Sequence, residues 1–348
     1  MTFYILVPMN CLVFRFSAMG DVALTVPVLR SALEQNPSLK ITMVSNKAFE
    51  PFFHDLPNFE FYGVTLKDYN GTTGLYRLYK ELNKHQKWDA VLDIHSVMRT
   101  WVLGTFFKWR RIPVYKIDKG REAKKALTRK KKKQLVQLPH TTERYAKVFT
   151  QAGIKLNLNF GEAIHSSKPL PNLTLDSSLL WIGIAPFSKH QQKEWPLDKV
   201  KELIGQLSKL SKFEILLLGG GSKEKEILEK LCSPYKNVHS LVGKFSLSEE
   251  ITLVKKLSLL VSMDSFNLHL ATLLGVKVVS IWGATHSFAG FGPVGENNAY
   301  QVEIPAKELE CRPCSIFGSK PCHRGDFACM QQISVEMVME KINFALNS

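Results

Sequence analysis

Short apolar and β-branched runs alternate with amphipathic stretches along nearly the whole chain. The apolar runs are typical of strands, and the stretches between them repeat their apolar positions at helical spacing. Because the strands are largely apolar, the pattern favours parallel sheets that helices cover on both faces. In the first half it predicts strands at 11–16, 40–44, 90–94 and 113–115, and helices at 75–82, 97–107 and 142–151.

A polar, proline-containing stretch at 166–178 interrupts this pattern, which then restarts. Two such halves predict an α/β protein made of two Rossmann-like, doubly wound parallel-sheet domains, residues 1–175 and 176–332. The 348 residues are long enough for two separate cores. The sequence also predicts a last helix within 333–348 that packs back across to the first domain. The second half contains predicted strands at 180–185, 213–218, 259–262 and 276–282, and helices at 197–208, 223–232, 247–256 and 267–274.

Composition narrows the class of protein. With 45% hydrophobic and 22% charged residues, the chain is neither disordered nor collagen-like. No stretch reaches the roughly 20 uninterrupted apolar residues of a membrane-spanning helix. Residues 3–14 lack a basic leader and contain Pro8 and Asn10, which favours a buried strand over a signal peptide, and Met1 and Met9 are both candidate starts. Six cysteines are too few for a secreted disulfide scaffold, so we expect a cytoplasmic protein.

Positive charge is concentrated in one segment. The chain has 46 Lys and Arg against 31 Asp and Glu, a formal net charge of +15. The basic segment, residues 108–133, holds 13 Lys and Arg and only two acids, Asp118 and Glu122. Such a run is either a solvated loop or a surface that attracts phosphates, acidic sugars or an anionic membrane. Few aromatic residues follow Tyr115, so no nucleic-acid partner is expected.

Residues just after the strands are the candidates for chemistry, because ligands of open parallel sheets bind beyond the carboxyl ends of the strands. The first strand is followed by Arg-Phe-Ser-Ala-Met-Gly-Asp at 15–21 and then by a helical pattern. Asp21 has two interpretations that the sequence leaves open. It either caps the helix or acts as a general base that takes a proton from an acceptor hydroxyl.

The second half offers a denser set of polar residues after its strands. Lys193, in the loop before a helix, is placed to meet a phosphate or is an ordinary surface lysine. The glycine turn 219–221 matches neither a dinucleotide-binding fingerprint nor a Walker A loop. Asp264 can accept hydrogen bonds from sugar hydroxyls beside a helix N-terminus that can bind a diphosphate. His269 is either a ligand or a satisfied core residue.

Four of the cysteines lie close together in the sequence. Their spacing begins with a Cys-x2-Cys pair, as in many zinc sites, but the second pair is six residues apart. A structural zinc ion, reduced packing thiols and redox-sensitive thiols all remain open. The four are Cys311, Cys314, Cys322 and Cys329.

The ordered motifs as a set carry a family resemblance. Arg-Phe-Ser-Ala-Met-Gly-Asp at 15–21, Lys-x-Trp-Pro at 193–196, Asp-Ser-x-x-x-His-Leu-Ala at 264–271 and Trp-Gly-Ala-Thr at 282–285 follow one another at spacings that resemble glycosyltransferase family 9. These are the ADP-heptose:lipopolysaccharide heptosyltransferases and their relatives. The resemblance implies a GT-B architecture, with two domains facing a central cleft. It also implies inversion at the anomeric carbon and no cofactor required for catalysis.

The resemblance assigns roles to residues of this chain. It implies that Asp21 is the catalytic base and that the acceptor is bound mainly by the first domain. The donor-binding set that it implies is Ser188, Lys193, Glu224, Phe245, Asp264, Ser265 and His269, with Glu226 as an alternative to Glu224. The acceptor-binding set is Arg15, Ser17, Gly20, Asp93, His95 and Arg99.

The implied function is transfer of a sugar, heptose from ADP-heptose, to a hydroxyl of a lipopolysaccharide core or related anionic glycolipid. A peripheral position at the inner face of the cytoplasmic membrane fits the basic segment. Phe266 stands where many members have glycine, and His95 where glutamine is common, so the exact donor sugar and acceptor stay open. Two rivals remain: a GT-B nucleotide-sugar epimerase, which turns over without acceptor, and a basic nucleic-acid binder with steep salt dependence.

Overall fold

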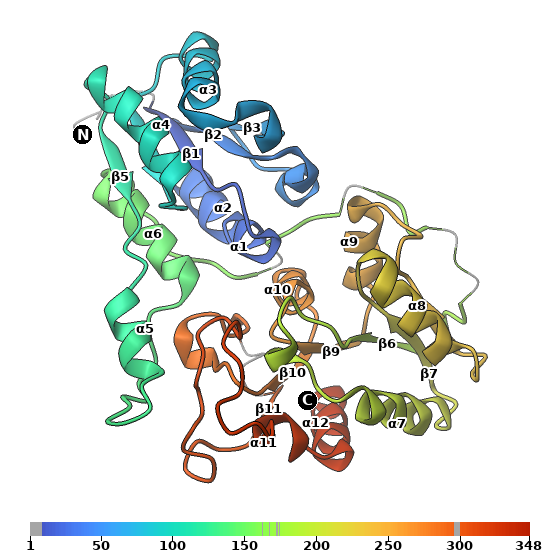
Figure 1. Ribbon diagram of the computed structural model, residues 1–348. Coiled ribbons are helices and arrows are strands. Elements are labelled where there is room, and N and C mark those ends of the chain that lie inside the picture. The colour runs from blue at the N-terminus through green and yellow to red at the C-terminus, as the bar shows by residue number, and fades with distance from the viewer. Residues whose placement is uncertain (1–8, 162, 167, 172, 174, 296–299) are drawn as a thin grey trace, which may run out of the picture. The chain divides into compact units, whose positions relative to one another are not determined.

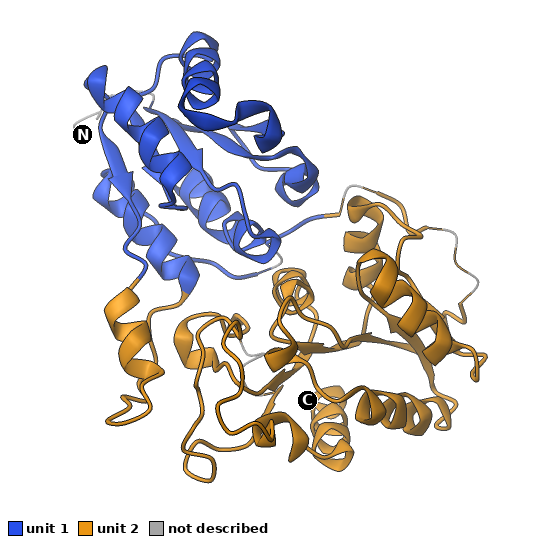
Figure 2. Ribbon diagram, in the orientation of Figure 1, with its two compact units in different colours: residues 1–119, 141–165 blue, residues 120–140, 166–348 orange. Residues whose placement is uncertain are grey.

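The computed structural model describes residues 9–161, 163–166, 168–171, 173, 175–295 and 300–348; the predicted run 3–14 lies partly outside them. The chain forms two units (Figure 1), each built on one sheet of parallel strands (Figure 2). Unit 1 comprises Met1–Lys119 and Thr141–His165, and unit 2 comprises Gly120–His140 and Ser166–Ser348. The predicted class, α/β with two parallel sheets, is confirmed.

The sheet of unit 1 has the strand order β3-β2-β1-β4-β5. Its central strand, β1, is buried over its last four residues because helices cover both faces of the sheet. The strands are β1 (Met9–Phe14), β2 (Leu39–Asn46), β3 (Phe59–Val64), β4 (Ala90–Asp93) and β5 (Val114–Lys116). The helices are α1 (Met19–Ala23), α2 (Val26–Gln35), α3 (Gly71–His85), α4 (Met98–Trp109) and α6 (Thr141–Gln151), with the 3-10 segments η1 (Lys47–Phe53) and η2 (Leu66–Tyr69).

The sheet of unit 2 has the order β11-β10-β9-β6-β7-β8. Its strands are β6 (Leu180–Ala185), β7 (Phe213–Leu217), β8 (Val238–Ser240), β9 (Leu259–Met263), β10 (Val278–Trp282) and β11 (Gln301–Glu303). Its helices are α5 (Arg121–Leu127), α7 (Leu197–Ser208), α8 (Gly221–Cys232), α9 (Leu247–Lys255), α10 (Phe266–Leu273), α11 (Ala328–Gln331) and α12 (Val335–Asn347), with η3 (Gln191–Lys193) and η4 (Ser287–Ala289).

Each strand order contains one point where the chain reverses its direction across the sheet. In unit 1 this point lies between β1 and β4, and in unit 2 between β6 and β9. The loops after the two strands at such a point diverge, which leaves a crevice where ligands of doubly wound sheets bind. The residues that follow β1, β4, β6 and β9 are therefore the first place to look for a site.

The division of the chain differs from the sequence-based one near residue 175. Unit 1 ends at His165, and residues 120–140, expected in the first domain, belong to unit 2. Within unit 2 the Leu138 amide donates to the Phe288 carbonyl at 2.9 Å, and Leu127 and Leu138 pack against Ala289. Apolar side chains therefore anchor the end of the basic segment to unit 2. They are hard to recognise in the sequence because most of their neighbours are charged.

The last helix was predicted within residues 333–348, and the structure shows how it packs within its own unit. The helix α12 packs against α7, β9, β10 and β11, all in unit 2. Apolar residues Val338, Ile342 and Ala345 are fully buried there, which extends the core of that unit. Among the helices of the described residues, none is both long and apolar enough to cross a bilayer.

Candidate functional site

The loop between β1 and α1 holds an ion pair at the reversal point of unit 1. Nη2 of Arg15 lies 2.6 Å from Oδ2 of Asp21, and Nη1 donates to the Ile94 carbonyl at 2.9 Å. The helix α1 begins after Ala18, and no side chain caps that end. Asp21 therefore does not make the hydrogen bond that a helix cap requires, and Arg15 orients its carboxylate instead. Its side chain remains 28% exposed, so a ligand can reach it.

Arg15 is nearly buried, and its surroundings keep it charged. Burial alone would lower the pKa of Arg15, but Tyr145 and Asp21 outweigh this and raise it. The Arg15 guanidinium lies 5.6 Å from the centre of the Tyr145 ring, and the Tyr145 hydroxyl donates to the Asp21 carbonyl at 3.3 Å. The α6 helix thus holds the β1–α1 loop in place through Tyr145.

The loop after β4 brings His95 to the same end of the sheet. Nδ1 of His95 accepts a hydrogen bond from the Phe16 amide at 3.3 Å, so the ring carries its proton on Nε2. Burial, helped by the nearby positive charge of Arg15, lowers the pKa of His95 to about 3. The ring is therefore neutral at physiological pH and presents an N–H donor.

The other predicted acceptor-side residues have different surroundings. Asp93 is fully buried, and its Oδ1 accepts from the amides of His95 at 3.1 Å and Ser96 at 2.6 Å, so this carboxylate shapes the turn. Gly20 is buried, whereas Ser17 and Arg99 are exposed. The structure ties Arg15, Asp21 and His95 into one cluster and makes Asp93 a support of that cluster.

Unit 2 assembles three of the predicted donor-side residues at its own reversal point. Nζ of Lys193 lies 3.0 Å from Oδ2 of Asp264 and also donates to the Asp264 carbonyl at 3.0 Å. Oγ of Ser188 donates to the same carbonyl at 2.9 Å. Ser188 and Lys193 follow β6 and Asp264 follows β9, so the neighbouring strands bring the three together. The Lys193 and Asp264 side chains are only 13% and 8% exposed.

The helix α10 begins beside this cluster. Ser265 is its N-cap residue, and no side chain caps its first amides. These amides and the helix dipole favour an anion at this end. His269 is buried within the helix.

Glu224 lies in the first turn of α8, which follows β7, and Phe245 lies in the loop after the neighbouring strand β8. Oε2 of Glu224 accepts from the Gly220 amide at 2.7 Å, and Gly221 has a φ of +81° that glycine adopts readily. Glu226, the alternative to Glu224, instead pairs with Lys230 at 2.7 Å on the surface. Phe245 is half-buried before α9. Glu224 also lines a cavity of about 450 Å³ with Phe187, Gln191, Lys223, Ile227 and Met330.

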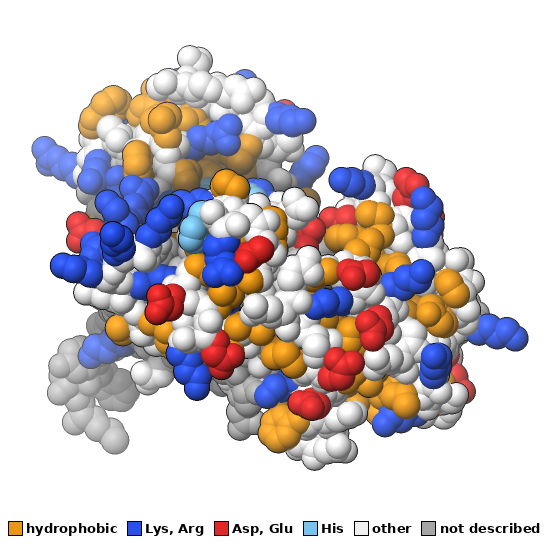
Figure 3. All heavy atoms as spheres, turned by 60° about the horizontal axis from the view of Figure 1, so that its bottom comes forward, with side chains coloured by type: hydrophobic (Ala, Val, Ile, Leu, Met, Phe, Trp, Pro, Cys, Tyr) orange, Lys and Arg blue, Asp and Glu red, His pale blue; other side chains and the backbone are white. Residues whose placement is uncertain are grey.

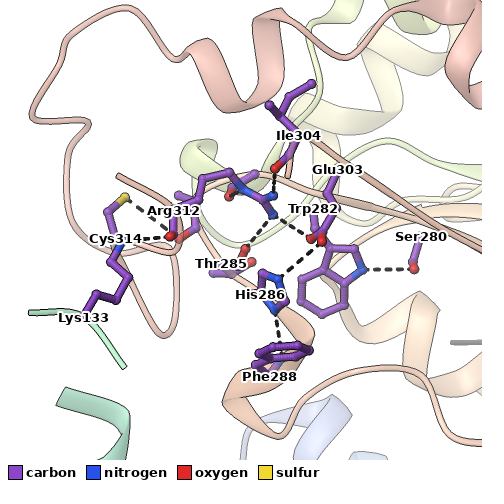
Figure 4. Close-up of polar contacts among 12 residues, drawn as sticks. Lys133, Ser280, Trp282, Thr285, His286, Phe288, Glu303, Ile304, Arg312 and Cys314 are labelled. Atoms are coloured by element: carbon purple, nitrogen blue, oxygen red, sulfur yellow. Dashed lines mark hydrogen bonds and ion pairs between the residues drawn. The ribbon is translucent and has the colours of Figure 1, made fainter. Parts of the chain in front are cut away.

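Sequence reasoning missed a buried arginine. Arg312 lies in the Cys-Arg-Pro-Cys motif, where the cysteines suggest the chemistry, yet its side chain is fully buried. Its polar contacts are shown in Figure 4. It donates to the Gly283 carbonyl at 2.6 Å and the Thr285 carbonyl at 3.3 Å, bonds the Ile304 carbonyl, and pairs with Glu303 at 2.9 Å. Arg312 therefore fixes the turn after β10.

Two neighbours extend this network (Figure 4). Nε2 of His286 lies 3.3 Å from Glu303, and its Nδ1 accepts from the Phe288 amide at 3.1 Å. Burial raises the pKa of Glu303, but its bonds to His286 and Arg312 outweigh this and lower it. Nζ of Lys133, in the basic segment, donates to the carbonyls of Glu310 and Arg312 at 2.8 and 2.7 Å. Lys133 therefore has a structural use.

Replacing Arg312 with methionine should destabilise unit 2 strongly. The change leaves three carbonyls and the Glu303 carboxylate without their shared donor, and breaking a buried ion pair costs about 3–5 kcal/mol. Urea unfolding measures it. Arg324→Met is the matched control, because Arg324 pairs with Asp326 at the exposed surface and its loss should change stability little. Equal unfolding midpoints for the two variants would contradict a structural role for Arg312.

The four clustered cysteines are the candidate metal ligands of the sequence. Among the described residues, no group of three or more His, Cys, Asp or Glu side chains is placed to hold a metal. The thiols of Cys311, Cys314, Cys322 and Cys329 are free. Burial raises the pKa of Cys329 to about 11 and also raises that of Cys314. A structural zinc ion, reduced packing thiols and redox-sensitive thiols therefore all stay predictions for these four residues.

Known proteins resemble this chain in sequence and in fold. Residues 75–315 match the model of glycosyltransferase family 9 (heptosyltransferase). The lipopolysaccharide core heptosyltransferase OpsX of Haemophilus influenzae is 23% identical over 281 residues, which cover 79% of each chain.

Solved structures match over nearly the full chain. A family 9 glycosyl transferase from Veillonella parvula has a TM-score of 0.73 at 19% identity and covers 98% of both chains. The heptosyltransferase WaaC of E. coli, solved with ADP, has a TM-score of 0.69 at 22% identity and covers 97% of this chain and 100% of its own. WaaC has also been solved with ADP-2-deoxy-2-fluoro heptose. These matches confirm the GT-B fold.

Proposed function

The chain belongs to glycosyltransferase family 9, the heptosyltransferase family, and we propose that it transfers heptose from ADP-heptose to a hydroxyl of an anionic lipopolysaccharide-core acceptor. The single observation that carries this proposal is the chemistry at the two reversal points. Unit 2 has a cation and uncapped helix amides where a diphosphate can bind, and unit 1 has an oriented carboxylate where a hydroxyl can lose its proton.

On the donor side, Lys193 is the group that meets the developing charge. When the glycosidic bond to the diphosphate breaks, negative charge grows on the leaving phosphate oxygen. A positioned ammonium and the first amides of α10 stabilise that charge without reorganising, because their positions are already fixed by Asp264 and by the helix. Lys193 contacts Oδ2 of Asp264, so we assign Oδ1 of Asp264 to accept hydrogen bonds from the sugar.

On the acceptor side, Asp21 is the proposed general base. Arg15 holds Oδ2, which leaves Oδ1 to take the proton of the acceptor hydroxyl as it attacks the anomeric carbon. The neutral His95 offers its Nε2–H to a second acceptor oxygen. One base and one stabilised leaving group suffice for a single displacement, which inverts the anomeric centre. We propose that this reaction needs no metal ion.

The charge distribution supports an anionic acceptor at the inner membrane surface. Lys and Arg side chains gather at one side of the face shown in Figure 3. In unit 2, a cavity of about 800 Å³ is lined by cationic side chains of the basic segment and of residues 307–324, which favours phosphate or acidic-sugar groups. The cationic residues of its lining are Arg129, Lys130, Lys307, Lys320 and Arg324, beside Glu308 and Glu310.

A thermal-shift panel of nucleotide-sugars tests the donor. ADP-heptose should raise the unfolding temperature, because a ligand that binds the native state stabilises it in proportion to its affinity. UDP- and GDP-sugars at the same concentration should have little effect. A larger shift with a UDP-sugar would reassign the donor. Consumption of a nucleotide-sugar in the absence of acceptor would favour the epimerase class instead.

A further inference from the structure

The helix α4 is apolar on the side that faces solvent as well as on the side that faces the sheet. It packs beside α3 on one face of the first sheet (Figure 1), where Leu103 and Phe107 are fully buried. On its outer side, Met98 is 75% and Trp109 is 74% exposed, and Trp101 is 41% exposed. These residues recur at helical spacing, so they share one side of α4.

The exposed apolar side chains form one patch with the neighbouring helix. Tyr76 of α3, 42% exposed, has its ring 5.3 Å from that of Phe106, and the Phe106 ring lies 5.6 Å from Trp109. We name Tyr76, Met98, Trp101 and Trp109 the α4 patch. Single exposed apolar residues are ordinary, but several large ones clustered on one helix mark a surface that binds something.

The charges on α4 and on the residues that flank it in the chain have one sign. From residue 94 to residue 117 the chain contains no Asp or Glu. Two lysines lie near its aromatic rings: Nζ of Lys116 is 6.0 Å from the centre of the Trp101 ring, and Nζ of Lys80 is 4.9 Å from that of Tyr76. The exposed cations between residues 94 and 117 are Arg99, Lys108, Arg110, Arg111 and Lys116.

We propose that the α4 patch docks unit 1 on an anionic phospholipid surface. Tryptophan, tyrosine and methionine enter the boundary between headgroups and acyl chains, while surrounding lysines and arginines meet the lipid phosphates. The inference rests on the proposed function and deepens it, because a lipid-linked acceptor would lie in such a surface. It assigns the membrane contact to α4 and its neighbours, whereas the sequence directed attention to residues 108–133 as a whole.

Charge complementarity favours a membrane over a second copy of this chain. In a two-fold dimer the α4 patch would meet itself, which would place its five exposed cations against the same five in the partner. The chain as a whole has a net charge of +15, which adds to that repulsion. An anionic lipid surface instead neutralises these charges and covers the apolar side chains at the same time.

Vesicle sedimentation tests this inference. Wild-type protein should bind vesicles of phosphatidylethanolamine with phosphatidylglycerol at least roughly tenfold more strongly than phosphatidylcholine vesicles, and salt should weaken the binding. The double variant Met98→Ala, Trp109→Ala should bind the anionic vesicles roughly tenfold more weakly, which corresponds to about 1.4 kcal/mol. The matched control, Leu210→Ala with Phe344→Ala, removes exposed apolar side chains from unit 2 and should bind like the wild type.

Two further measurements separate this inference from the proposed function. The vesicles contain neither donor nor acceptor, so failure of the transfer reaction leaves the binding result intact. On a delipidated, water-soluble acceptor, the Met98→Ala, Trp109→Ala variant should turn over like the wild type. Equal vesicle binding by this variant and the wild type would overturn the inference. A second contradicting result would be that the variant binds vesicles like the wild type but loses binding to a single-stranded oligonucleotide. A third would be that the wild type forms a dimer in solution and the variant does not.

Discussion

Replacing Asp21 with asparagine should lower turnover about 10²–10⁴-fold and leave ADP-heptose binding unchanged. Asparagine keeps the size of the side chain and can still bond Arg15 through its oxygen, but it cannot take a proton at neutral pH. The donor should bind normally because Ser188, Lys193 and Asp264 all belong to unit 2, whereas Asp21 belongs to unit 1. The measurement is single-turnover transfer with saturating donor and acceptor, with donor affinity determined separately by calorimetry.

Asp198→Asn is the matched control for this variant. Asp198 lies in the first turn of α7, as Asp21 lies in the first turn of α1, and it is exposed. Any general effect of losing a carboxylate near a helix N-terminus should therefore appear in both variants and be small. Near-wild-type turnover of Asp21→Asn would remove this residue from the mechanism.

Replacing Lys193 with methionine should lower kcat about 10²–10³-fold and weaken ADP binding as well. Methionine keeps much of the apolar stem but removes the ammonium, and loss of one group that stabilises a developing oxyanion has an effect of this size. The ground-state diphosphate also loses a cation, so the affinity for ADP falls together with kcat. Steady-state kinetics and ADP titration measure the two effects.

Two companions make the Lys193 result interpretable. Lys193→Met leaves Asp264 nearly buried without its ion pair, so the fold must be checked by thermal unfolding. Lys193→Arg keeps the charge and should recover part of the activity. Lys189→Met changes an exposed lysine of the same loop and should have no effect. If Lys193→Met kept wild-type kcat in a folded protein, the leaving group would have to be stabilised elsewhere.

The central strands were predictable from the sequence, whereas of the edge strands β3, β5, β8 and β11 only β5 was predicted. The strand β6 was predicted over the range that the structure shows, because its residues after Leu180 are buried and therefore uniformly apolar. The strand β3 was not predicted, since it lies at the edge of its sheet and its residues are mostly half-exposed. The edge strands β8 and β11 were missed because each has only three residues, too few for a recognisable alternation of apolar and polar positions.

The candidate site was predictable where it follows central strands. Ser188, Lys193 and Asp264 come together because β6 and β9 are neighbours, a pairing that two Rossmann-like halves already imply. The direction of a side chain was not predictable, as Asp93 shows by bonding backbone amides. Arg312 was missed because nothing local in a Cys-Arg-Pro-Cys motif indicates that β10 and β11 will surround its guanidinium with carbonyls.

The most direct test of the proposed function is transfer itself, followed by mass spectrometry of the acceptor. The purified protein is incubated with ADP-heptose and a lipopolysaccharide-core acceptor that lacks heptose. We predict that the acceptor gains one heptosyl residue, that ADP appears in equal amount, and that ADP release requires the acceptor. ADP release at the same rate without acceptor, or an acceptor that gains a sugar only from a different nucleotide-sugar, would contradict the assignment of this chain as an ADP-heptose-dependent heptosyltransferase.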